Sequence, residues 1–197
     1  SKENLGMGAG NNLGIKNANK DFVLILNPDV TLEKSAMDEM ILASKKIDNF
    51  GIIAPLSDKS EYPNYTLKKN YNFDPIKPFK VKSVDGFAML LNVKKINQIY
   101  DFKNFKFFDE NIFLYLENDD FCKRLIDAKE SIYVVPKSKI NHLGGRAVSQ
   151  KFSEQVELSR NWHWIWSKFY FQKKHKGYFI ALINGFPAFL SAILKYI

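Results

Sequence analysis

The sequence is poor in several features that define whole classes of protein. Its 197 residues contain one cysteine, Cys122, so an internal disulfide framework is excluded and a reducing compartment is favoured. The first residues, Ser-Lys-Glu-Asn, are not followed by an apolar segment of the signal-peptide type. Internal repeats, low-complexity tracts and linkers between domains are also missing, so we expect an ordinary folded domain.

Long hydrophobic runs are scarce as well. The stretch from Tyr178 to Leu194 is uncharged over 17 residues, slightly fewer than the ~20 that cross a bilayer. Asn184, Gly185 and Pro187 interrupt it. We therefore expect a helix on a membrane surface or in the core, with a true span as the alternative.

Acidic residues are outnumbered by basic ones. There are 29 Lys and Arg against 21 Asp and Glu, which gives a net charge of +8 and suggests an anionic partner: nucleic acid, a nucleotide or a phospholipid surface. The hydrophobic fraction of 46% and the length fit one domain with a proper core. Aromatic residues, at 15%, are enriched in the second half of the chain.

The run from Phe22 to Leu26 is the clearest structural signal. Five consecutive apolar residues are too few for a helix and predict a strand covered on both faces. Pro28 cannot extend a central strand, so Asp29 lies just beyond its carboxyl end, where open α/β sheets bind ligands. A carboxylate there suits a hard divalent cation, although Asn-Pro-Asp is also good turn chemistry needing no ligand.

The neighbouring segments predict an α/β arrangement. A glycine-rich turn opens a short helix that ends near Lys20, and Thr31 is a plausible N-cap for a helix to Ile47. A second buried strand at 51–55 would then pair in parallel with 22–26 through a right-handed crossover. Further elements are expected as a loop or hairpin over 57–80, strands near 81–93, 131–135 and 139–142, and helices over 119–128 and 153–174.

The stretch from Phe108 to Arg124 concentrates carboxylates among aromatic residues. Its acids are Asp109, Glu110, Glu117, Asp119 and Asp120. Acids in apolar surroundings hold protons more tightly, which suits a general base near neutral pH. Acids at a helix start also complement the helix dipole, and Arg124 could simply pair with Asp120. The residues alone leave both interpretations open.

The segment around His142 offers a second chemical possibility. His142 could complete a metal shell begun by Asp29, and the following Gly144, Gly145 and Arg146 form a good anion site. A satisfied structural histidine is the alternative. The glycine-rich opening only superficially resembles a dinucleotide fingerprint, because no strand precedes it.

The last quarter of the chain is basic and aromatic. Between Arg160 and Lys176 there are five basic residues and no acidic one, interleaved with Trp, Phe and Tyr. This mixture is typical of an interfacial membrane helix, could bind single-stranded nucleic acid, or could complete the core with its aromatic face.

Read in order, these segments resemble the family 2 inverting glycosyltransferases of the GT-A fold, particularly the rhamnosyltransferase-like branch. The matching stretches are Asn4-Leu5-Gly6 to Asn12-Leu13-Gly14, Leu26 to Asp29, Asp85 to Leu90, Phe108 to Arg124, and His142 to Gly145. The resemblance implies an α/β fold with a mixed, mostly parallel sheet flanked by helices. It implies a partial GT-A domain over 1–150 and a helical, membrane-associated extension over 151–197.

The resemblance also implies roles for individual residues. Asp29 would bind the metal, Mg²⁺ or Mn²⁺, with His142 as a further metal or diphosphate contact. Glu117, Asp119 or Asp120 would supply the base. Substrate-binding positions would be Asn4, Gly6, Asn12, Asn27, Asp85, Gly86, Gly144, Gly145 and Arg146. We expect the acid after the first strand, the mid-chain acids and the imidazole to converge on one site.

The implied reaction moves a sugar from a nucleoside-diphosphate sugar to a glycan or lipid-linked glycan. It would take place in the cytoplasm, on the inner face of the membrane, which 160–197 would contact; no nucleic acid is expected. Two departures matter: the usual base position falls on Asn118, and the family's N-terminal nucleotide-binding strand has no counterpart here. The rival hypotheses are a non-catalytic glycan-binding or scaffolding remnant and, less favoured, a basic nucleic-acid-binding module.

Overall fold

The computed structural model of the chain describes residues 3–58, 63–69, 71–99, 106–142 and 153–194. Its helices are α1 (Met7–Asn17), α2 (Ala36–Lys46), α3 (Val93–Ile99), α4 (Glu117–Asp127), α5 (Ser153–Lys176) and α6 (Tyr178–Leu194). Its strands are β1 (Phe22–Leu26), β2 (Val30–Leu32), β3 (Ile52–Ser57), β4 (Tyr65–Thr66), β5 (Phe79–Val81), β6 (Ser83–Val84), β7 (Ala88–Asn92) and β8 (Ile132–His142).

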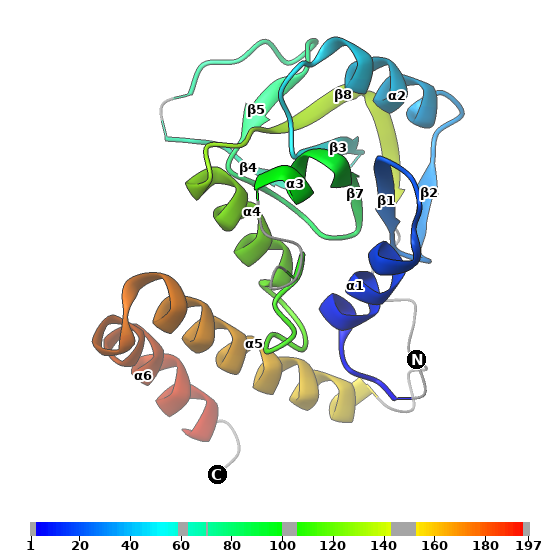
Figure 1. Cartoon of the computed structure of the whole chain (residues 1–197). Helices are drawn as coiled ribbons and strands as arrows, with labels where there is room; N and C mark the ends of the chain where they lie inside the picture. Colours follow the sequence, from blue (N-terminus) through cyan, green and yellow to red (C-terminus); the bar gives the residue numbers. More distant parts are fainter. Residues whose placement is uncertain (1–2, 59–62, 70, 100–105, 143–152, 195–197) are drawn as a thin grey trace.

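A mixed sheet forms the centre of the molecule (Figure 1). The main strand order is β1-β7-β3-β8-β2, with β5 also pairing with β8, while β4 and β6 form a separate two-stranded sheet. Among the described strands, only β3 and β8 are parallel neighbours, and the other pairs are antiparallel. The carboxyl ends of β1, β3 and β8 nevertheless point the same way, because β7 runs against both β1 and β3.

The mixed α/β class expected from the sequence is confirmed, with corrections to its details. The predicted parallel pair of 22–26 and 51–55 is wrong, because antiparallel β7 lies between β1 and β3. The predicted strands 131–135 and 139–142 are one strand, β8, whose pairing with β3 shifts between Pro55 and Leu56. Thr31 is not an N-cap: it lies in β2 opposite Asn141, and α2 begins after Ser35.

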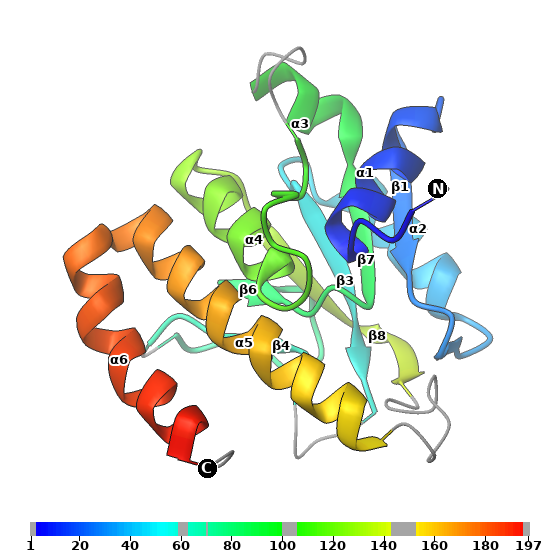
Figure 2. The same ribbon diagram turned by 90° about the horizontal axis from the view of Figure 1, so that it is seen from below.

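Helices cover both faces of the sheet (Figures 1 and 2). On one face, Met40 and Ala43 of α2 pack with Ile53 of β3 and Leu90 of β7. The larger core lies on the other face, where α1, α3 and α4 contribute residues such as Ile15, Ile96 and Phe121. The alternation of buried residues along β7 and β3 is lost because both faces are covered.

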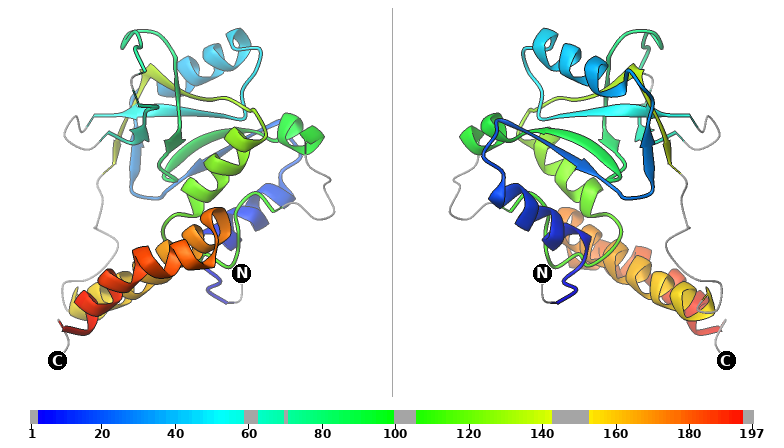
Figure 3. Two further views of the ribbon diagram at one scale, coloured as in Figure 1. Left: turned by 90° about the vertical axis from the view of Figure 1, so that its left-hand side faces the viewer. Right: turned by 90° about the vertical axis from the view of Figure 1, so that its right-hand side faces the viewer.

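The C-terminal helices form a hairpin beyond α4. In Figures 1 and 2, α5 lies between α4 and α6, and the hairpin projects away from the sheet in the side views of Figure 3. The predicted helix over 153–174 is confirmed and extends to Lys176. Within the described residues, no helix is both long and apolar enough to cross a membrane. A domain boundary near residue 150 stays a prediction.

Candidate functional site

Asp29 and His142 meet at the carboxyl ends of two strands. Asp29 follows β1, His142 is the last residue of β8, and the imidazole Nε2 lies 3.3 Å from Asp29 Oδ2. Both side chains are partly exposed, at 23% and 26%. β2 fixes this approach, because Val30 lies opposite His142 in the antiparallel pairing. The predicted meeting of these two residues is confirmed.

The turn between β6 and β7 joins this pair. The ring of Phe87 stacks on the imidazole of His142 with centroids 4.2 Å apart. The carbonyl of Phe87 accepts a hydrogen bond from the backbone N–H of Asn27, at 2.9 Å. Asp85 and Gly86 therefore lie beside the ends of β1 and β8; substrate binding by them stays a prediction.

The first turn of α4 approaches the same turn closely. Asn118 Nδ2 donates to the carbonyl of Val84 at 2.9 Å. Gly86 is buried, and a Cβ there would lie 3.3 Å from Asn118 Cβ and 3.2 Å from Met7 Cε. Glycine at 86 thus lets α1, α4 and the β6–β7 turn come together.

Asp85 and Asp119 carry mutually repelling carboxylates. Burial raises the pKa of Asp85, and the charge of Asp119 raises it further, while His142 lowers it. Burial also raises the pKa of Asp119, against a hydrogen bond from Ser83. Asp85 is thus influenced both by Asp119 in the first turn of α4 and by the imidazole at the end of β8. We call Asp29, Asp85, Glu117, Asp119 and His142 the strand-end cluster.

Glu117 is the most perturbed acid of the strand-end cluster. It is 3% exposed, and its Oε2 has no hydrogen-bond partner among the described residues. Burial raises its pKa to about 7, with a smaller contribution from Asp119 and an opposing one from its own backbone N–H. The raised pKa predicted for acids in this aromatic stretch is found for Glu117 and Asp119, but the prediction is wrong for Asp109 and Glu110, whose pKa values are lowered by hydrogen bonds from neighbouring side chains. A group like Glu117 titrates near neutral pH, as a general base must.

Asp120 differs sharply from its neighbour Asp119. It is fully buried and contacts Arg124 Nε at 2.8 Å, Lys174 Nζ at 2.7 Å and His175 Nε2 at 2.8 Å. Lys174 also contacts Asp109 at 2.7 Å. We call these five residues the cationic clamp. A fully buried carboxylate enclosed by three basic side chains has no face open to an acceptor hydroxyl, so these contacts favour the structural alternative for Asp120 over its predicted role as base.

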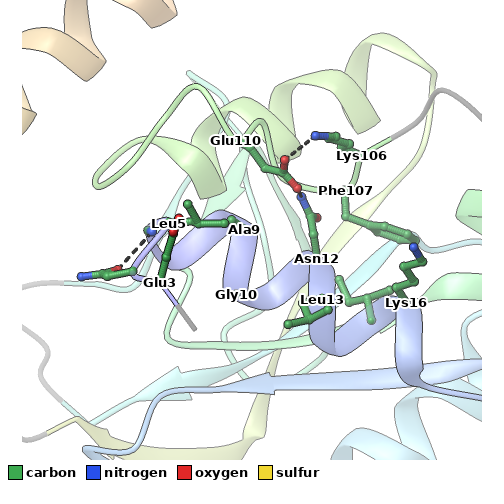
Figure 4. A pocket seen from close by; sticks show the side chains of 13 residues that line it. Glu3, Leu5, Ala9, Gly10, Asn12, Leu13, Lys16, Lys106, Phe107 and Glu110 are labelled. Carbon is green, nitrogen blue, oxygen red and sulfur yellow. Dashed lines mark hydrogen bonds and ion pairs between the residues drawn. The ribbon is translucent and has the colours of Figure 1, made fainter. Parts of the chain in front are cut away.

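The predicted substrate residues in and just before α1 line a hollow of about 670 Å³ (Figure 4). Asn12 is fully engaged: it exchanges hydrogen bonds with the backbone of Phe108 and donates to Glu110. Asn4 accepts a hydrogen bond from the N–H of Gly6. Gly6 has φ +90°, and a Cβ there would lie 2.4 Å from the carbonyl oxygen of Phe113, so only glycine fits. These contacts give Asn12 and Gly6 structural reasons; substrate binding by Asn4, Gly6 and Asn12 stays a prediction.

The remaining predicted residues divide into two groups. Asn27 lies in the turn after β1, beside the strand-end cluster. Gly144, Gly145 and Arg146 lie outside the described residues.

Three residues near the predicted acids were not predicted from the sequence: Phe87, Lys174 and His175. Phe87 could have been found from its place beside Asp85-Gly86, but nothing local links α5 to Asp120.

The donor set at the strand ends fits a divalent cation held jointly with a substrate. Asp29 and His142 offer one carboxylate and one imidazole at a separation that two ligands of one ion adopt. No group of three metal-ligating side chains occurs among the described residues. A cation bound here would therefore take its remaining ligands from diphosphate oxygens and water.

One relative of this chain is a hexosyltransferase. A scan against protein-family models found no match. The chain is 30% identical over 139 residues to the low-salt glycan biosynthesis hexosyltransferase Agl10 of Haloferax volcanii, a match that covers 61% of this chain. The chain spans 43% of that relative's length.

Solved structures give the fold. GalNAc-T7, crystallised with UDP, GalNAc and Mn²⁺, superposes with a TM-score of 0.58 over 90% of this chain and 40% of that one, at 11% identity. A197 from STIV gives a TM-score of 0.48 over 70% of this chain and 65% of that one, also at 11% identity. The likeness to GalNAc-T7 shows that the two chains share the architecture of the sheet and its flanking helices.

Proposed function

We propose that this chain carries the site of a metal-dependent hexosyltransferase, which moves a sugar from a nucleoside-diphosphate sugar to a glycan or lipid-linked glycan. The observation that carries the proposal is the convergence of the strand-end cluster from four separate segments of the chain. The hexosyltransferase relative and the fold shared with GalNAc-T7 support the same conclusion.

The donor diphosphate would be bound at Asp29 and His142. A Mg²⁺ or Mn²⁺ held there would offset negative charge on the leaving diphosphate. The imidazole is fixed for this role by the ring of Phe87 and by β2, so little reorganisation is needed on binding.

The base is assigned to Asp119, because its carboxylate is partly exposed and its pKa is raised. Asp119 would take the proton of the acceptor hydroxyl as that oxygen bonds to the anomeric carbon. The bond from this carbon to the diphosphate breaks on the opposite side, which inverts its configuration. Glu117 is the second candidate, since it is ionisable near pH 7 but more deeply buried.

Asn118 supports a different possibility. An amide stands where the resemblance places the base, and it is already bound to the carbonyl of Val84. A non-catalytic remnant that binds glycans would keep the fold without a base at this position.

Two further parts of the proposal come from the resemblance alone: the placement on the inner face of the membrane and the rhamnosyltransferase-like branch.

Calorimetric titration with UDP-glucose, GDP-mannose and dTDP-rhamnose, each with and without Mn²⁺, tests the proposal. We expect at least one donor to bind only with Mn²⁺, and Asp29→Asn to weaken that binding at least tenfold, since it removes a charged ligand. Asp21→Asn, an exposed acid before β1, is the matched control. Metal-independent binding of glycans without donor binding would instead favour the remnant.

A further inference from the structure

The outward face of α6 is apolar along its whole length. Phe179, Ile183, Phe186 and Leu190 follow one another at helical spacing and are exposed to 80%, 72%, 59% and 43%. A surface helix of a soluble protein normally presents charged residues on this face. No residue of α6 is charged.

The inward face of α6 is already occupied by α5. Ala181 is fully buried, and a Cβ on Gly185 would touch the ring of Phe169 at 3.4 Å. Asn184 donates a hydrogen bond to Gln172 at 2.8 Å. The two helices therefore form one unit, and the exposed stripe is what remains after they have packed.

The charge of this hairpin identifies its partner. From Arg160 to Leu194 the chain has basic residues and no acidic one, and Lys173 and Lys176, in the last turn of α5, are exposed. A second copy of this chain would bring the same positive charges to the contact. An anionic lipid surface offers both an apolar layer and complementary charge.

We propose that the α5–α6 hairpin docks the protein on an anionic lipid bilayer, with the outward stripe of α6 lying among the lipids in the plane of the interface. At 17 residues, and with Pro187 inside it, α6 is suited to lie on the surface rather than cross it. This surface is separate from the strand-end cluster and does not depend on sugar transfer.

Flotation of the full chain with vesicles tests the proposal. We expect binding to phosphatidylcholine vesicles containing about one-third phosphatidylglycerol, and much weaker binding to phosphatidylcholine alone. Ile183→Asn should weaken binding about tenfold or more, because it removes an apolar side chain from the lipid. Ile76→Asn, at a site that is 69% exposed in a loop, is the matched control.

Lysine substitutions test the electrostatic part of the binding. Lys173→Gln together with Lys176→Gln should weaken binding to anionic vesicles by at least tenfold, whereas Lys45→Gln with Lys46→Gln on α2 should not. Absence of flotation at low salt would overturn the proposal, as would flotation indifferent to Ile183→Asn. A dimer that the same substitution dissociates would assign the stripe to a second copy instead. None of these readouts needs donor or metal, so they stand apart from a failure of the proposed transfer.

A second inference comes from the backbone that leads into α4. Tyr115 and Leu116 have φ values of +69° and +67°, in the left-handed region that non-glycine residues rarely adopt. They immediately precede Glu117. Such a conformation persists only where surrounding contacts hold it.

These contacts come from α5. Ser167 is fully buried, and its hydroxyl donates to the carbonyl of Leu114 at 2.7 Å. The ring of Trp164 meets that of Tyr115 at 5.7 Å, and His163 stacks on Phe113 at 4.5 Å. One face of α5 thus contacts residues 113–115, which lead into the acids of the strand-end cluster.

We infer that Ser167 is a positioning residue, which holds the left-handed turn and through it the orientation of Glu117 and Asp119; this inference rests on the proposed function. Ser167→Ala should lower kcat about 10- to 100-fold with an almost unchanged KM for the donor. Amide exchange in residues 113–119 should become faster. Ser44→Ala, which removes a similar hydroxyl-to-carbonyl bond in α2, is the control.

Rescue separates positioning from a general loss of stability. Glycine adopts positive φ freely, so Leu116→Gly should restore much of the kcat lost in Ser167→Ala. An active Leu116→Gly variant that brings no recovery in the double variant would overturn the inference, as would unchanged exchange over 113–119. The exchange measurement needs no substrate, so it holds even if the chain transfers no sugar.

Discussion

Asp119 and Asp120 are neighbours in one turn of α4, yet they occupy opposite environments. Asp119 is partly exposed, burial raises its pKa, and its charge in turn raises the pKa of Asp85. Asp120 is enclosed by Arg124, Lys174 and His175. The same type of side chain is therefore partly exposed at one position and fully enclosed by basic groups at the next.

The strand-end cluster and the cationic clamp also differ in the pKa values of their other acids. Glu117 of the strand-end cluster has a pKa raised to about 7 by burial without a partner. Burial would also raise the pKa of Asp109 in the cationic clamp, but hydrogen bonds from Lys174 and Asn111 outweigh it and lower that pKa to about 2. The comparison teaches that basic partners, rather than burial, decide which acids of this stretch are available for chemistry.

The largest effect is expected on turnover. Asp119→Asn should lower kcat by about 10²–10⁴ while donor binding is retained, because only the proton acceptor is removed. Asp127→Asn, an exposed acid later in α4, should be harmless. Steady-state kinetics and calorimetry on the same samples make the test. Normal turnover in both Asp119→Asn and Glu117→Gln would place the base elsewhere.

The next effect is on stability. Asp120→Asn should lower the free energy of unfolding by about 3–5 kcal/mol at pH 7, since it leaves buried basic groups without their anion. Urea denaturation measures this, with Asp127→Asn again as control, because a surface i,i+4 pair contributes under about 1 kcal/mol. A loss at Asp120 no greater than at Asp127 would contradict the structural role of the cationic clamp.

Glu117 should make the free energy of unfolding depend on pH. Folding raises the pKa of its carboxyl from the ordinary 4.5 to about 7. The stability that Glu117 contributes is therefore complete below pH 4.5 and is lost as the pH rises through 7. The loss amounts to at most about 3 kcal/mol. Glu117→Gln should remove most of this decline and be more stable than the unaltered chain at pH 8. Denaturation series from pH 4 to 8 test it; identical slopes for both proteins would refute the assignment.

The smallest effect concerns Asp109. Its lowered pKa contributes stability that is complete above about pH 4 and is lost as the pH falls through 2. Asp109→Asn should therefore cost about 1–2 kcal/mol at pH 7, less than the pKa alone suggests because Lys174 is partly exposed. The difference should vanish in strong acid. A carboxyl resonance of Asp109 that titrates near pH 4 would contradict the prediction.

Hydrophobic runs and helix-start residues in the sequence predicted individual strands and helices, but not how distant strands pair. The apolar run 22–26 is β1, and the acids before Phe121 start α4 two residues earlier than expected. Thr31 was misassigned because its partner, Asn141, is remote in the sequence. The position of β7 between β1 and β3 has the same cause: long-range pairing overrides the expectation that consecutive elements are neighbours.

The candidate site follows the same division. Asp29 and His142 could be foreseen because each lies at the carboxyl end of a strand, and such ends gather at one edge of a sheet. The roles of Asp120 and Asn12 could not. Asp120 takes its partners from α5, and Asn12 is bound to the backbone of Phe108, so each role is set by a contact that no spacing in the sequence reveals.

The position of β8 has a consequence for how the protein is made. This strand pairs with β2, β3 and β5, all of which precede it in the chain. During synthesis these three must wait, with unsatisfied edges, until residues 132–142 have left the ribosome. A pause in translation just before this point would therefore prolong the stage at which the nascent chain is most prone to aggregate.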